Sequence, residues 1–252
     1  MDLDKLLDFA ADVGKCLLES GGETSRVEDT LTRIIRHFYG GRSEILVVLT
    51  GFFVNIGSRT EIVRVQRRTI NLDRVSKINM MSREIVSGKL GFDEAVNRLE
   101  EIKAQKPYPL WIKTFAAALS CSFFTLLQSG GFADSINSFM TGAVVNVVLW
   151  LIKKCNTADF IVTFSGGVMT ALLTVMLYRL GLGDNVNAMI AGAIMPLVPG
   201  LGTTNALRDI IAGDYLSGGA RLFDAVVVAV ALATGAGITM YMFGNVSGGK
   251  LL

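Results

Sequence analysis

The segment from Met195 to Arg221 contains the residues best suited to chemistry, because helix-breaking and polar residues there interrupt an apolar stretch. Pro196 and Pro199 lack a backbone N–H, so each leaves a carbonyl in the run without its helical partner. A helix restarting near Thr204 would direct its positive N-terminal end at this break. Membrane proteins use such broken helices to hold small anionic or zwitterionic solutes. The residues expected to contact a solute are Pro196, Pro199, Gly200, Thr203, Thr204, Asn205, Arg208 and Asp209.

The chemistry of each side chain suggests its role in binding. The planar guanidinium of Arg208 suits a substrate carboxylate. Asp209 or Asp214 could accept the ammonium group of an amino acid, or could relay a coupling proton. A dicarboxylate would need a second cation, for which Arg221 is the nearest candidate. A substrate hydroxyl could be recognised by Thr203, Thr204 or Asn205.

Three charged residues near the end of this segment are candidates for coupling or gating: Asp214, Arg221 and Asp224. Asp224 lies on the same helical face as Arg221, one turn into the next apolar stretch. It could form a helix-end pair with Arg221 or take part in coupling, and both interpretations stay open. The segment as a whole has a simpler alternative, an ordinary cytoplasmic loop followed by a surface helix. The two prolines inside the apolar run favour solute binding.

The distribution of charge indicates which elements must position these residues. Of the 252 residues, 51% are hydrophobic and 18% are charged. The charged fraction is below the roughly 25% that is usual for soluble chains. Residues 1–106 hold 17 of the 24 basic and 16 of the 22 acidic side chains. We therefore expect an α-helical integral membrane protein, with a small cytoplasmic α+β domain at 1–106 and a membrane domain at 107–252.

The expected cytoplasmic domain has the element order α-α-β-β-α-α. Apolar residues at helical spacing predict a first helix that ends at Gly21-Gly22. A second helix is expected to start at Ser25, which would form a capping box with Glu28. The run 45–56 is rich in β-branched and aromatic residues, and with 61–66 it predicts a β-hairpin. Two more helices are expected near 71–87 and 92–105.

Five apolar stretches predict the membrane spans. A helix needs about 20 residues to cross the hydrocarbon core. The fourth stretch is cut short by Pro196 and Pro199, and Asp184 is expected to cap its outer end. The predicted spans lie near 110–128, 136–152, 159–179, 185–201 and 220–243.

Basic residues near the span ends predict the orientation. With the front domain inside, seven basic residues flank the inner ends of the spans and two, Arg179 and Lys250, lie outside. We expect the N-terminus in the cytoplasm and the C-terminus outside, in the cytoplasmic (inner) membrane. The inner basic residues are Lys103, Lys106, Lys113, Lys153, Lys154, Arg208 and Arg221.

Several classes of function find no support in the residues. Bases and acids alternate in the front half, so no basic stripe for nucleic acid forms. The only histidine is His37, no metal-ligand spacing occurs, and we expect no catalytic site, metal or cofactor. Cys16, Cys121 and Cys155 form no cluster and are expected to remain free of disulfides.

Two motifs resemble those of the threonine/serine exporter (ThrE-like) family, specifically the larger subunit of its split two-component form. One motif runs from Leu17 to Glu28. The other begins at Met195-Pro-Leu-Val-Pro-Gly200 and continues through Asn205-Ala-Leu-Arg-Asp209 to Gly218. The resemblance covers nearly the whole chain, including the polar front half.

The resemblance implies transport across the cytoplasmic membrane. The implied substrates are threonine and serine or, in some split systems, small dicarboxylates such as succinate. It also implies a second small membrane subunit as partner, and a homo-oligomer is a further possibility. An alternative of another class is a regulatory or scaffolding membrane subunit without transport activity of its own.

Overall fold

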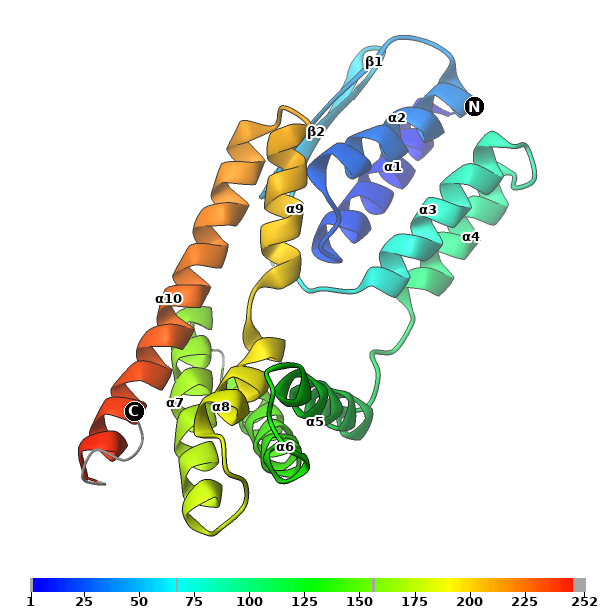
Figure 1. The fold of residues 1–252 in the computed structure, drawn as a ribbon. Helices are drawn as coiled ribbons and strands as arrows, with labels where there is room; N and C mark the ends of the chain where they lie inside the picture. Colours follow the sequence, from blue (N-terminus) through cyan, green and yellow to red (C-terminus); the bar gives the residue numbers. More distant parts are fainter. Residues whose placement is uncertain (1, 67, 156, 247–252) are drawn as a thin grey trace. The chain divides into compact units, whose positions relative to one another are not determined.

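The computed structural model describes residues 2–66, 68–155 and 157–246. The chain forms two compact units, shown as a ribbon in Figure 1. The first unit takes in the described residues up to Lys106 together with Leu201–Leu222, and the second takes in Pro107–Gly200 and the chain from Phe223 on. The segment Leu201–Leu222, which we expected in the membrane domain, therefore belongs to the first compact unit. Lys250, used in predicting the orientation, lies outside the described residues.

The first unit packs helices and a small sheet around one hydrophobic core. The helices are amphipathic, and their apolar faces meet the inward side chains of the sheet at residues such as Leu31, Phe52 and Ile78. Its elements are α1 (Leu3–Glu19), α2 (Thr24–Tyr39), β1 (Ser43–Val48), β2 (Gly51–Ile56), β3 (Arg59–Arg64), α3 (Leu72–Val86), α4 (Phe92–Lys103), most of α9 (Gly200–Ile211) and the start of α10 (Tyr215–Val246).

The sheet has three antiparallel strands in the order β1-β2-β3, so the predicted two-stranded hairpin is wrong. The run 45–56 is two strands, because the chain reverses at Leu49-Thr50 and pairs Val48 with Gly51. Gly51 permits a close approach, since a Cβ there would collide with the carbonyl oxygen of Val63 on β3. The turn was missed because Leu-Thr lacks the Asn-Gly or Asp-Gly signature of two-residue hairpins.

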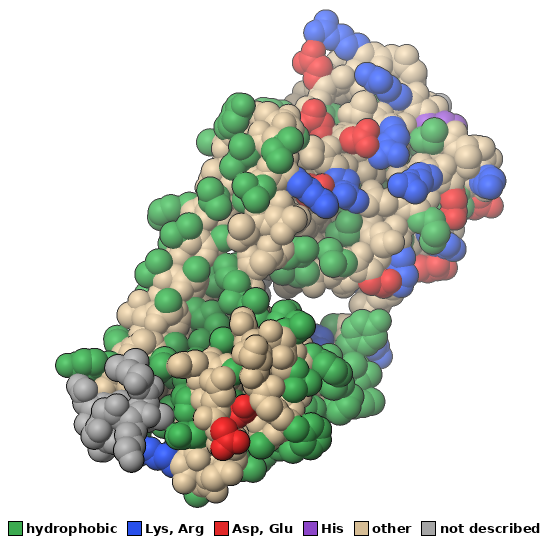
Figure 2. Space-filling model, viewed as in Figure 1, with side chains coloured by type: hydrophobic (Ala, Val, Ile, Leu, Met, Phe, Trp, Pro, Cys, Tyr) green, Lys and Arg blue, Asp and Glu red, His purple; other side chains and the backbone are tan. Residues whose placement is uncertain are grey.

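The second unit is a bundle of apolar helices. Its elements are α5 (Leu110–Leu127), α6 (Phe132–Lys154), α7 (Asp159–Arg179), α8 (Val186–Ile194), the 3₁₀ turn η1 (Met195–Leu197) and the rest of α10. Large apolar side chains such as Trp111, Phe123 and Leu127 are exposed, and hydrophobic residues predominate on the face of this unit visible in Figure 2, whereas charged residues gather over the first unit. This outward apolar surface is what a lipid environment requires.

Within the described residues, four helices are long and apolar enough to cross a membrane: α5, α6, α7 and α10. A fifth span results if α8–η1 and α9 are counted as one broken span. The predicted fourth span, 185–201, is therefore not one helix, since α8 and η1 end at Leu197 and α9 begins at Gly200. The cap of α8 is Asn185, whose side chain accepts from the N–H of Ala188, and not the expected Asp184.

Glycines bring the backbones of α7 and α10 close together in the second unit. A Cβ at Gly235 would collide with the carbonyl oxygen of Phe164, and one at Gly167 with that of Leu232. Close approach at small residues replaces the hydrophobic driving force that is missing between helices in lipid.

Candidate functional site at the α1–α2 loop and α9

The loop between α1 and α2 is shaped by a glycine pair. The N–H of Gly22 donates to the carbonyl of Leu17 and that of Gly21 to the carbonyl of Leu18, which is the Schellman pattern of hydrogen bonds. Gly21 has a φ of 82°, a left-handed conformation that favours glycine. The expected capping box at Ser25 does not form, because α2 begins at Thr24 with Glu23 in the cap position and no side-chain capping bond.

Four successive carbonyls of this loop are hydrogen bonded. Those of Glu19 and Ser20 accept from the N–H groups of Thr69 and Asn71, in the chain that leads into α3. Those of Gly21 and Gly22 accept from side chains of α9 and α10, namely Asn205 at 3.2 Å and Arg221 at 2.7 Å. The loop is therefore held on two sides.

A buried ion pair links α9 to the start of α10. Nε of Arg221 lies 2.9 Å from Oδ2 of Asp209, and the two side chains are 10% and 0% exposed. Neither of these two atoms has a hydrogen-bond partner within the described part of the chain, so the attraction between them is ionic. The hydroxyl of Thr24 donates to Oδ1 of Asp209 at 2.9 Å.

Glu23 is paired with two arginines at the mouth of the loop. Nη1 of Arg208 lies 2.6 Å from Oε1 of Glu23, and Nη2 of Arg26 lies 3.3 Å from Oε2. Burial opposes ionisation of the carboxylate, but the hydrogen bond from Arg208 and the charge of Arg26 outweigh that cost and hold the pKa of Glu23 below its ordinary value. Arg208 keeps 57% of its side chain exposed and remains accessible to a solute.

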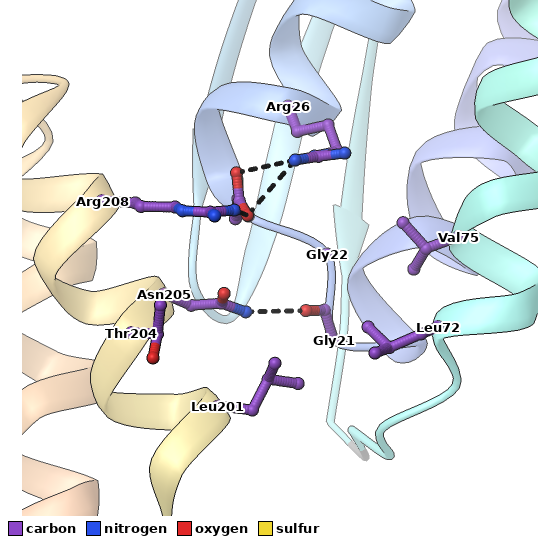
Figure 3. Close-up of a pocket in the computed structure, with 10 residues that line it drawn as sticks. Gly21, Gly22, Arg26, Leu72, Val75, Leu201, Thr204, Asn205 and Arg208 are labelled. Carbon is purple, nitrogen blue, oxygen red and sulfur yellow. Dashed lines mark hydrogen bonds and ion pairs between the residues drawn. The ribbon is translucent and has the colours of Figure 1, made fainter.

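A pocket of about 220 Å³ opens between the loop, α9 and the start of α3 (Figure 3). Figure 3 shows the α9 side chains on one side, the glycine loop facing them and two apolar residues of α3 opposite. Charged groups of both signs and two further polar side chains therefore meet in one small cavity. Its lining residues are Gly21, Gly22, Glu23, Arg26, Leu72, Val75, Leu201, Thr204, Asn205 and Arg208.

Three of the residues expected to bind a solute line this pocket: Thr204, Asn205 and Arg208. Asp209 is fully buried in the ion pair described above. The other expected contacts lie at or beside the break: Pro196 in η1, Pro199 between η1 and α9, and Gly200 and Thr203 in the first turn of α9. The helix thus restarts at Gly200, four residues before the expected position, directly after Pro199.

The three candidates for coupling or gating have separate environments. Asp214 caps α10 by accepting from the N–H of Ser217 at 3.1 Å. Burial opposes its ionisation, but bonds from Thr24 and Ser217 hold the pKa of Asp214 below its ordinary value. Arg221 lies in the buried pair with Asp209, and Asp224 is exposed on the part of α10 that belongs to the second unit.

Glu23 and Arg26 are the charged pocket residues that sequence reasoning did not assign. Both lie inside the first motif, directly after Gly21-Gly22. The usable signal was this glycine pair followed by charges at a helix start. It points to a loop with a special conformation, but it does not say that α9, about 180 residues later in the chain, completes the pocket.

Known proteins resemble this chain along most of its length. A family model for threonine/serine exporters (ThrE) matches residues 8–243. The "Probable threonine/serine exporter" of Mycobacterium tuberculosis is 24% identical over 92% of this chain and 45% of its own length. The "Threonine/serine exporter" of Corynebacterium glutamicum is 24% identical over 92% of this chain and 50% of its own. The chain thus spans about half the length of these relatives.

A shorter relative matches along most of its own length. The "Probable succinate transporter subunit YjjP" of Klebsiella aerogenes is 25% identical over 90% of both chains. No solved structure matches the chain significantly. The family consists of transporters and is not a class of enzymes. With its apolar helices and a family match over nearly its whole length, the chain is a multi-pass membrane protein that belongs to the threonine/serine exporter (ThrE) family.

Proposed function

We propose that the protein is a subunit of a secondary transporter that exports threonine and serine across the cytoplasmic membrane. The observation that carries the choice of substrate is the presence of both charge signs in the pocket of the first unit. A zwitterionic amino acid can insert between Glu23 and Arg208, with its ammonium on the carboxylate and its carboxylate on the guanidinium. One ion pair is then exchanged for two without a change in net charge.

The remaining pocket groups suit the rest of such a substrate. Arg26 provides a second cation beside the substrate carboxylate, and the polar side chains of Thr204 and Asn205 can bind the hydroxyl by which threonine and serine differ from alanine. At about 30 Å³ per water molecule, the cavity has room for roughly seven water-sized groups, close to the size of threonine.

The other predicted residues take supporting roles in this proposal. Pro196, Pro199, Gly200 and Thr203 form the break that ends η1 and starts α9. Asp209 and Arg221 hold α9 against the loop, and Asp214 or Asp224 provides the carboxylate for proton coupling or gating.

Succinate is the second candidate substrate. It is favoured by the Klebsiella aerogenes relative, whose length matches this chain and whose name contains the words "succinate transporter subunit". The pocket offers Arg26 and Arg208 to two carboxylates, but Glu23 would then repel a dianion. The word "subunit" in the same relative's name supports the proposal that this protein works with a second small membrane subunit. Assembly of this protein with copies of itself is also part of the proposal.

Export is tested in cells that lack this protein and are loaded with threonine-, serine- or alanine-containing dipeptides, or made to produce succinate. We expect the restored protein, with its partner subunit, to lower intracellular threonine and serine but not alanine. A lower intracellular concentration of succinate alone would identify succinate as the substrate in place of threonine and serine. No change in any solute would contradict transport and favour the regulatory role.

Replacement of Arg208 tests the pocket itself. Arg208→Ala removes a charge-assisted hydrogen bond to the substrate carboxylate, and we expect export to fall about tenfold or more. Arg33→Ala is the matched control, because Arg33 lies outside the pocket on α2 and pairs with Asp29 one turn away. Export at the wild-type rate in Arg208→Ala would remove Arg208 from the binding site while leaving transport in place.

A further inference from the structure

Polar side chains are buried where α6 meets α7 in the second unit. Asn137 and Thr141 lie one turn apart on α6, and Thr170 and Thr174 lie one turn apart on α7. All four side chains are at most 1% exposed. Nδ2 of Asn137 lies 3.4 Å from the carbonyl oxygen of Thr174, which places the two pairs side by side. We call these four residues the α6–α7 polar seam.

The hydroxyls of Thr170 and Thr174 have no hydrogen-bond partner among the described residues. A threonine in a helix ordinarily bonds its hydroxyl back to the carbonyl four residues earlier, as Thr163 on the same helix does to Asp159 at 2.9 Å. Burial of an unpaired hydroxyl costs free energy that a valine of the same shape would avoid. The helix therefore carries two polar groups that packing alone does not need.

A neighbouring group of buried hydroxyls shows the contrast. Thr125 on α5 donates to the hydroxyl of Ser138 at 2.6 Å, and Ser138 donates to the carbonyl of Met189 on α8 at 3.2 Å. Each of these hydroxyls is paired, so they link three helices. Within the seam, Asn137 donates to the carbonyls of Thr174 and Leu182 and accepts from Thr141. Its open hydrogen-bonding capacity therefore lies in the hydroxyls of Thr170 and Thr174.

The charged residue one turn before the seam on α6 is already engaged. Asp134, one turn before Asn137 on α6, accepts from the N–H groups of Gly131, Asp184 and Asn185. Its two oxygens thereby join the α5–α6 and α7–α8 loops. The hydrogen-bonding groups that the seam can offer a solute are consequently neutral.

We propose that the α6–α7 polar seam is part of the path by which a small, hydrogen-bonding solute crosses the membrane. The inference rests on the proposed export function, because a polar solute must meet polar groups somewhere within the spans. Neutral hydroxyls bind such a solute weakly enough to release it, which passage requires. In the absence of solute the hydroxyls of Thr170 and Thr174 stay unpaired.

The first experiment removes both hydroxyls. The double variant T170V/T174V keeps the shape of the side chains, and we expect its threonine export to fall on the order of tenfold, since two hydrogen bonds to the solute are lost. We expect its melting temperature in detergent to stay equal or rise. T163V is the control on the same helix, because that hydroxyl is satisfied by its own backbone.

The outcomes separate the seam from the pocket. Binding of threonine to the full-length protein in detergent, measured by calorimetry, should be unchanged in T170V/T174V and lost in Arg208→Ala. Two outcomes would contradict the role of the seam in transport: unchanged export by T170V/T174V, or reduced export together with a lower melting temperature. Neither outcome would contradict the proposed export function.

A second measurement does not depend on the identity of the substrate. Single variants T170C and T174C should react with a small, water-soluble methanethiosulfonate in membranes, above the background of the parent chain. A171C is the control, because Ala171 lies between them and is fully buried in an apolar cluster. Reaction no faster than that of A171C would overturn the seam even if the wild-type protein exported none of the tested solutes.

Discussion

Asp209 and Arg221 place opposite charges in a buried environment, where each would be costly alone. Removal of one partner from a buried ion pair typically costs about 3–5 kcal/mol, because the other charge is left uncompensated. Thr24 and the carbonyl of Gly22 supply further bonds to the pair. The charges therefore hold α9 and α10 against the α1–α2 loop, which keeps Arg208 in position at the pocket.

Glu23 makes the stability of this junction depend on pH. Its pKa is lower in the folded than in the unfolded protein, so its contribution to stability is complete above the unfolded value of about 4.3 and is lost as the pH falls through the folded value. We expect Glu23→Gln to lower the melting temperature at pH 7, and the difference from wild type to shrink as the pH falls below the unfolded value.

This dependence is measured by thermal unfolding of both proteins in detergent between pH 3 and 8. Asp29→Asn is a suitable control, because Asp29 lies on α2, the helix that follows Glu23, and forms an exposed pair with Arg33, of a kind worth little. A difference between Glu23→Gln and wild type that persists unchanged at pH 3 would show that the ion pairs of Glu23 are not its source.

At the scale of elements, contacts between helices explain the glycines of α7 and α10. Gly235 faces the backbone of α7, whereas Gly237, two residues later on the same helix, has no atom of the described residues within 4 Å of an added Cβ. The same substitution at the two positions therefore distinguishes the effect of helix packing on stability from the effect of helix propensity.

Gly235→Ala should destabilise the protein by about 1–3 kcal/mol, because the new methyl group must push α7 away. Gly237→Ala should be neutral or slightly stabilising, since alanine favours the helix. Melting temperatures of the two variants in detergent test this expectation, and equal effects would mean that α7 and α10 do not pack through Gly235.

At the scale of the whole molecule, the proposed orientation places the first unit and its pocket in the cytoplasm. Basic residues near the span ends support this placement, since they favour the inner side. We expect a green fluorescent protein fused before Asp2 to fluoresce, and an alkaline phosphatase joined at Gly181, in the α7–α8 loop, to be active outside. The reverse pattern of activities would invert the proposed topology and place the pocket on the outer face.

Local patterns in the sequence predicted most elements of the fold. Helical periodicity located α1 to α4, and apolar stretches located α5, α6, α7 and α10 within a few residues, because both signals arise from neighbouring residues. The same locality explains the errors. The turn at Leu49-Thr50 lacks the residue types that usually mark a two-residue hairpin. Asp184 and Asn185 are equally good N-cap residues, so residue type alone does not decide which of the two caps α8.

The sequence by itself determined the polar front half, the apolar helices, the break at Pro196 and Pro199, and the likeness to a family of exporters. Only the tertiary structure decided the partners of the charged residues: Arg208 pairs with Glu23, and Asp209 with Thr24, each across 185 positions of the chain. It alone also left Thr170 and Thr174 unpaired within the described residues. Periodicity and composition report which face of a helix is buried, whereas the identity of a distant partner depends on which faces meet when the chain folds.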